Sequence, residues 1–122
     1  FRYDETEENE NETFSEYLIT LMERHKISIK KLAKASGVSE SVINKYRSYT
    51  ETAYTVPVVL KLCLGMNAFP YETINLLKLM GHYLEPAKTK RNKLYLKLVT
   101  EDYDKDISFW NEHLKANGEV AL

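Results

Sequence analysis

Residues 28–47 have the sequence Ser-Ile-Lys-Lys-Leu-Ala-Lys-Ala-Ser-Gly-Val-Ser-Glu-Ser-Val-Ile-Asn-Lys-Tyr-Arg, and this stretch decides the fold. Its pattern predicts two short helices joined by a tight turn at residues 35–39. Gly37 can adopt the positive φ that such a turn needs, and the Ser39 hydroxyl can cap the second helix. The apolar positions of both helices and of the turn share an inner side, formed by Leu32, Ala33, Val38, Ile43 and Tyr46.

This stretch resembles the helix-turn-helix of the phage repressor/Cro superfamily, also called the XRE-like family. The matching residues are Leu32-Ala33, Gly37-Val38-Ser39 and Ile43, and the resemblance covers Phe14 to about Gly81. It implies an all-α protein with a five-helix repressor-like domain, followed here by a C-terminal helical extension. It also implies sequence-specific binding of double-stranded DNA and transcriptional regulation in a bacterium or phage. The recognition helix, at about 39–47, would enter the major groove, and members of the family commonly bind as homodimers.

The resemblance also implies which side chains would contact DNA. The start of the recognition helix approaches base edges in this family, which assigns base contacts to Glu40, Ser41, Asn44 and Lys45. Backbone phosphates would be contacted by Lys30, Lys31, Lys34, Arg47 and Tyr49. The competing interpretation is an ordinary solvated surface, and Tyr49 and Tyr54 could instead cover the edge of the core.

Two positions depart from the family pattern. The second position of the second helix is often glutamine in the family and is Ile29 here, and the recognition helix begins with Glu40 and Ser41 where glutamine is frequent. An apolar Ile29 beside Val42 could mark a surface that contacts another protein. The alternative function is therefore a helical protein-interaction module of a larger protein that does not bind DNA.

Charge is distributed unevenly along the chain. The net charge of the whole chain is −1, but residues 1–17 carry −6, residues 18–97 carry +9 and residues 98–122 carry −4. A basic central region can attract phosphates even in a protein that is nearly neutral overall. The acidic residues 1–12, which lack an apolar period, are predicted to be a disordered tail or linker that could screen that region.

The periodicity predicts the bounds of the helix-turn-helix domain and of the extension that follows it. Residues 13–84 are expected to form the helix-turn-helix domain, with Thr13 capping a first helix that ends near His25. A fourth helix would carry Pro57 in its first turn and end at Gly65, and a fifth would run from Pro70 to Gly81.

Residues 85–122 are expected to form the two-helix C-terminal extension. Its first helix spans about 88–99 and its second about 106–118, with Ile107, Trp110 and Leu114 on one side. Trp110 and its neighbours are a hypothetical dimer interface. Because the first residue is Phe1 rather than methionine, an upstream domain or protein partner is another expectation.

Composition argues against other classes. The single cysteine, Cys63, lies among leucines and is expected to be a buried apolar residue, which favours a reducing cytoplasm. Three separated histidines predict no metal site, and no cofactor motif is present. The chain lacks a phosphate loop, a nucleophile elbow and an apolar run of the roughly 20 residues that a membrane helix needs. We therefore expect neither an enzyme nor a membrane protein.

Overall fold

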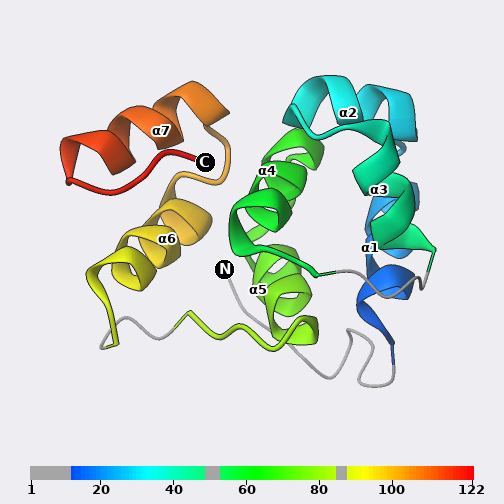
Figure 1. Ribbon diagram of the computed structural model, residues 1–122, viewed down its shortest axis with the longest axis horizontal. Coiled ribbons are helices and arrows are strands. Elements are labelled where there is room, and N and C mark those ends of the chain that lie inside the picture. Colours follow the sequence, from blue (N-terminus) through cyan, green and yellow to red (C-terminus); the bar gives the residue numbers. More distant parts are fainter. Residues whose placement is uncertain (1–11, 49–52, 85–87) are drawn as a thin grey trace.

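The computed structural model describes residues 12–48, 53–84 and 88–122, which form seven helices and no strand (Figure 1). The acidic tail predicted for residues 1–12 lies almost wholly outside this part. The all-α prediction is confirmed, as is the helical extension. The helices are α1 (Phe14–Arg24), α2 (Ile29–Ser36), α3 (Glu40–Arg47), α4 (Val56–Met66), α5 (Pro70–Leu79), α6 (Lys90–Glu101) and α7 (Ile107–Ala116).

Local sequence signals start most of these helices where they were expected. Thr13 and Glu16 form a reciprocal capping box on α1, and Ser39 accepts a hydrogen bond from the Val42 amide at the start of α3. Ser28 and Asp106 cap α2 and α7 in the same way. A helix start is set by groups only a few residues apart, so short sequence windows suffice to predict it.

The prediction for the end of α4 is wrong. Gly65 lies inside the helix, which continues to Met66 and ends at Asn67 with φ 56°. The Ala68 amide donates to the Cys63 carbonyl at 2.9 Å and completes the turn. Asn67 adopts the left-handed conformation that often ends a helix, because its short polar side chain tolerates it.

Gly65 instead permits a close contact between α2 and α4. A Cβ atom at this position would lie 2.9 Å from Ser36 Cβ and 3.1 Å from Leu32 Cδ1. Both neighbours are buried on the inner side of α2. The missing side chain is what lets α2 approach α4 this closely.

The helices enclose one core that continues into the extension. In Figure 1, α4 and α5 stand between the α1–α2–α3 group and the α6–α7 pair. The extension contributes Tyr95, Leu98, Val99, Trp110 and Leu114, each at most 4% exposed, to the same cluster. Trp110 is 2% exposed and its indole N–H donates to the Asp102 carbonyl at 2.9 Å. Trp110 therefore packs within the chain, and a dimer interface formed by other residues of the extension stays a prediction.

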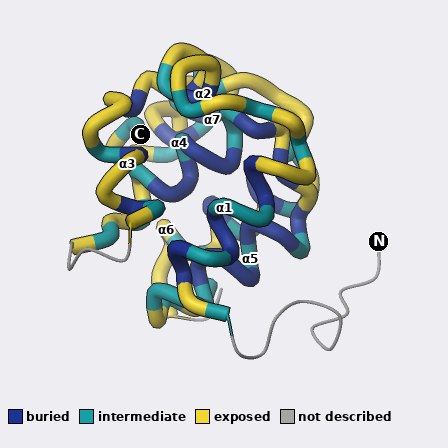
Figure 2. Tube along the Cα trace, turned by 90° about the vertical axis from the view of Figure 1, so that its right-hand side faces the viewer, coloured by how far each residue is buried: buried dark blue, intermediate teal, exposed yellow. Residues whose placement is uncertain are grey.

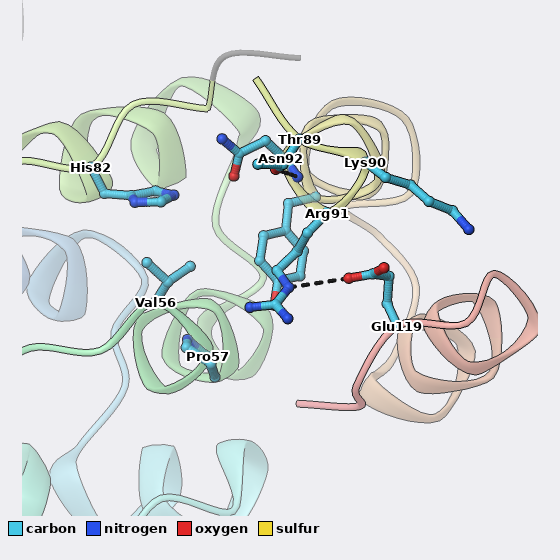
Figure 3. Close-up of a pocket in the computed structure, with 9 residues that line it drawn as sticks. Val56, Pro57, His82, Thr89, Lys90, Arg91, Asn92 and Glu119 are labelled. Atoms are coloured by element: carbon cyan, nitrogen blue, oxygen red, sulfur yellow. Dashed lines mark hydrogen bonds and ion pairs between the residues drawn. The ribbon is translucent and has the colours of Figure 1, made fainter. Parts of the chain in front are cut away.

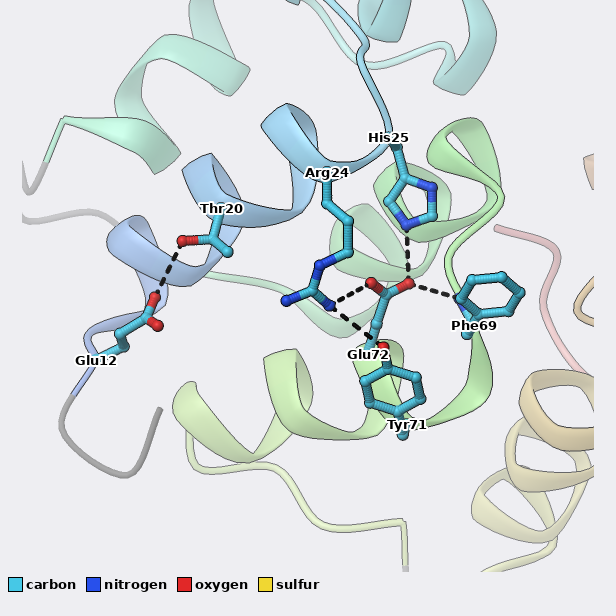
Figure 4. A network of polar contacts seen from close by, with 7 residues as sticks. All are labelled: Glu12, Thr20, Arg24, His25, Phe69, Tyr71 and Glu72. Atoms are coloured by element: carbon cyan, nitrogen blue, oxygen red, sulfur yellow. Dashed lines mark hydrogen bonds and ion pairs between the residues drawn. The ribbon is translucent and has the colours of Figure 1, made fainter. Parts of the chain in front are cut away.

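A buried carboxylate ties the end of α1 to the start of α5 (Figure 4). The Glu72 side chain is fully buried, and its Oε2 accepts from Arg24 Nη1 at 2.7 Å. Its Oε1 lies 2.8 Å from His25 Nε2 and accepts from the Phe69 amide at 2.8 Å. A buried charge of this kind is tolerated because several donors replace the lost water.

The remaining core predictions concern single residues. Cys63 is buried, as expected, and burial raises the pKa of its thiol to about 12. At neutral pH this thiol is protonated and behaves as a small apolar side chain. No helix in the described ranges is both long and apolar enough to cross a membrane.

Candidate nucleic-acid interface

The turn between α2 and α3 has the geometry that its sequence predicts. Gly37 has φ 75° and its amide donates to the Ala33 carbonyl, which ends α2. The Ser36 hydroxyl donates to the Leu32 carbonyl at 2.6 Å and accepts from the Val38 amide at 3.1 Å. With Val38 only 6% exposed, the turn is anchored from inside and fixes α3 relative to α2.

The polar residues of α2 and α3 that are assigned to DNA contacts are exposed, apart from the half-buried Arg47. Figure 2 shows exposed segments of the chain on both helices. On α3, the opposite side is buried through Ile43 and Tyr46, which are 0% and 3% exposed. Residues three and four apart share one side of a helix, so Lys30 lies beside Lys34, Glu40 beside Asn44 and Ser41 beside Lys45. The exposed set on α3 is Glu40, Ser41, Asn44 and Lys45, and the exposed set on α2 is Lys30, Lys31 and Lys34.

Arg47 and Tyr49, the two remaining candidates, are placed differently. Arg47 is only half-buried at the end of α3, so part of its side chain stays accessible. Tyr49 lies outside the described residues, and its assignment to phosphate stays a prediction. Glu40 occupies the first turn of α3, where a carboxylate also stabilises the positive end of the helix dipole.

The back of α3 is held by an aromatic cluster that the sequence pattern did not reveal. The Phe14 ring stacks on Tyr54 at a centroid distance of 4.0 Å and meets the Tyr46 ring edge-on at 5.7 Å. The Ser15 hydroxyl donates to the Tyr46 carbonyl at 2.6 Å, and the Tyr46 hydroxyl accepts from the Thr55 amide at 3.3 Å. Tyr54 therefore packs against the core. This is the second of the roles considered for the tyrosines of this loop, which could cover the edge of the core.

These contacts join residues up to 40 positions apart, from Phe14 to Tyr54. Helical periodicity predicts that an apolar residue faces inward, but it does not say which rings will meet across the core. The sequence placed Tyr46 on the inner side and allowed Tyr54 to cover the edge of the core. It did not indicate which aromatic rings would be in contact.

The apolar residues that suggested a protein-contact surface are partly buried. Ile29 and Val42 are of intermediate exposure and pack against the core cluster. They help to hold α2 and α3 on the domain and do not form an exposed apolar patch.

The basic residues at the start of α6 are remote from α3. Figure 1 places α4 and α5 between the two helices. Lys90 Nζ donates to the Asn117 carbonyl, and Arg91 Nε donates to Glu119 Oε1 at 3.1 Å. Both cations therefore make contacts within the extension and are not part of the patch on α2 and α3.

Residues 18–67 match the family model of the Cro/C1-type HTH DNA-binding domain. This segment runs from within α1 to the residue that ends α4, and it includes the whole α2–turn–α3 unit. This segment is thus similar to the Cro/C1-type DNA-binding domains, which confirms the resemblance to the phage repressor/Cro superfamily. The helices α5 to α7 lie outside the matched segment.

Neither the curated proteins nor the solved structures include one that matches the chain significantly. The described residues hold no group of three or more His, Cys, Asp or Glu side chains that could bind a metal ion. The family match and the geometry of α2 and α3 are thus the grounds for a functional assignment.

Proposed function

We propose that this protein is a transcriptional regulator that binds double-stranded DNA sequence-specifically, with α3 in the major groove. The observation that carries the proposal is a short, capped helix with a buried back and a wholly polar exposed side. An α-helix with its side chains is about 10–12 Å in diameter, and the major groove is about 12 Å wide. A helix of this size can lie in the groove while the core behind it keeps its orientation fixed.

The side chains on α3 suit different readout tasks. Lys45 can donate to the O6 and N7 acceptors of guanine, and Asn44 can pair with the N6 and N7 edge of adenine. Glu40 can only accept, which fits the N4 amino group of cytosine and repels phosphate. Ser41 can donate or accept with several bases, so it supplies contact with little selectivity.

The exposed lysines of α2 suit the DNA backbone. Lys30, Lys31 and Lys34 lie on the exposed side of the helix that precedes the turn. Contacts of a flexible ammonium group with phosphate orient the protein without selecting a sequence. Binding of a second copy at a two-fold site remains part of the proposal, because family members commonly bind in that way.

The test is selection of bound sites from a random duplex pool, followed by titrations over a range of salt concentrations. Lys45→Ala should weaken binding to the selected site by about 1–3 kcal/mol and relax the preference at one base pair. Lys31→Ala should weaken all sequences alike and reduce the slope of log K against log salt by about 0.9. A matched control is Lys93→Ala, which removes an exposed lysine of α6. Absence of salt-dependent binding to any duplex would overturn the proposal.

A further inference from the structure

A cavity of about 480 Å³ lies between the start of α4 and the start of α6 (Figure 3). Val56 and Pro57 line it from the DNA-binding domain, and His82 lines it from the segment after α5. Arg91, Asn92 and Glu119 line it from the extension. Its volume falls within the roughly 300–1,000 Å³ that is usual for sites that bind small molecules.

Three hydrogen-bonding side chains in this cavity have capacity to spare. His82 Nε2 is buried and has no hydrogen-bond partner among the residues that the structure describes. Arg91 uses Nε to bind Glu119 at 3.1 Å, which leaves its two terminal nitrogens without a hydrogen bond in the described ranges. The Asn92 backbone amide donates to the Thr89 hydroxyl at 2.9 Å, and no hydrogen bond of its side chain is seen within the described part of the chain. Of these groups only His82 Nε2 is a buried atom, and buried polar atoms are rarely left unpaired, whereas the Arg91 side chain is 55% exposed.

The arrangement of these groups favours an anion. Figure 3 shows the Arg91 guanidinium beside Pro57, with the His82 ring and the Asn92 amide on the opposite side of the cavity, while Lys90 points away. Guanidinium, imidazole and amide N–H groups are donors that match the several acceptor oxygens of a phosphate or carboxylate. The Glu119 carboxylate already accepts a hydrogen bond from Arg91 Nε, so it would compete with such a ligand for Arg91.

We propose that this cavity binds a small organic anion, a phosphate ester or carboxylate, through Arg91, His82 and Asn92. An anionic group of the ligand binds Arg91 beside Pro57, and the rest of the ligand spans the cavity to the His82 ring and the Asn92 amide, with Val56 and Pro57 along its apolar part. The wall from α4 belongs to the DNA-binding domain and the wall from α6 belongs to the extension. A ligand here therefore contacts both parts of the chain without touching the exposed side of α3.

The test follows the His82 ring and Arg91 side-chain resonances by NMR while inorganic phosphate or acetate is added to the full chain. Saturable shifts at both side chains are expected. Arg91→Gln should weaken binding about tenfold or more, because it removes the charge-assisted hydrogen bonds. Glu119→Gln should strengthen it severalfold, because the competing carboxylate is gone. Lys93→Gln, the same loss of charge on the same helix outside the cavity, should change nothing.

Three results of the anion titrations would overturn the assignment. The first is the absence of saturable shifts with either anion. The second is equal binding by the Arg91→Gln chain, and the third is weaker binding by Glu119→Gln in a protein whose far-ultraviolet spectrum is unchanged. A short duplex is then added to the phosphate-loaded protein. Displacement of phosphate by DNA would identify the DNA backbone as the source of the anion and would overturn the assignment to a small molecule. Retention of phosphate supports it, whether or not α3 binds DNA.

Discussion

At the scale of single residues, Gly65 has the clearest structural role. The atoms that a Cβ would meet include Ser36 N at 3.1 Å and Ser36 Cβ at 2.9 Å, which belong to or adjoin the α2 backbone. Such atoms cannot move aside as the end of a flexible side chain can. The position therefore sets how closely the two helices approach, and through α2 it sets the position of the turn.

Gly65→Ala should lower the free energy of unfolding by about 1–2 kcal/mol, measured by urea denaturation. Alanine favours a helix interior by about 1 kcal/mol over glycine, but overpacking a tight contact costs about 1–3 kcal/mol, and here the backbone must shift. Lys93→Ala on the exposed side of α6 is the control and should stay within about 0.5 kcal/mol of the parent chain. A more stable Gly65→Ala variant would show that the contact between α2 and α4 relaxes freely.

At the scale of elements, α3 is too short to be stable without its surroundings. Its eight residues make few internal hydrogen bonds, so the cap at one end and the aromatic cluster behind the other end supply its order. The Ser39 hydroxyl accepts from the Val42 amide at 3.2 Å in an exposed position. The cap therefore stabilises the start of the helix, where Glu40 and Ser41 lie.

Ser39→Ala should cost about 1 kcal/mol of stability, because the Val42 amide loses its acceptor. If α3 reads DNA, the same variant should also weaken duplex binding under conditions where it is fully folded, since the contact residues become less ordered. Ser108→Ala in α7, at an exposed position, is the matched control and should alter neither quantity. Unchanged stability with weaker binding would point instead to a direct contact of Ser39 with DNA.

At the scale of the whole molecule, the core unites all the helices, whereas the charge differs between segments of the chain. The core joins α1 to α7 in one cluster, whereas the charge changes sign from −6 over residues 1–17 to +9 over residues 18–97. Opposite charges on one chain attract through water over a Debye length of about 10 Å at 0.1 M salt. The acidic start can therefore compete with DNA phosphates for the basic region.

Deletion of residues 1–12 should raise affinity for duplex DNA at low salt, with a gain that shrinks as salt is added. The physical reason is the loss of six carboxylates that compete with phosphate. The control is a full-length chain in which amides replace these six carboxylates. It keeps the length of the chain and removes the charge, so it should bind DNA as the deletion variant does. Equal affinities at low salt in filter binding or fluorescence anisotropy would contradict the screening.

The sequence alone determined the helices, most of their caps, the α2–turn–α3 unit and the exposed residues of α3, because these depend on groups within a few positions of one another. Tertiary structure decided the rest. Gly65 was predicted to end a helix and instead lies inside α4, where it allows close contact with α2, and Trp110 was expected at an interface and instead lies in the core. The cluster behind α3 and the cavity beside Arg91 also join segments far apart in the chain. Periodicity shows that a residue faces inward, and only packing determines what it meets there.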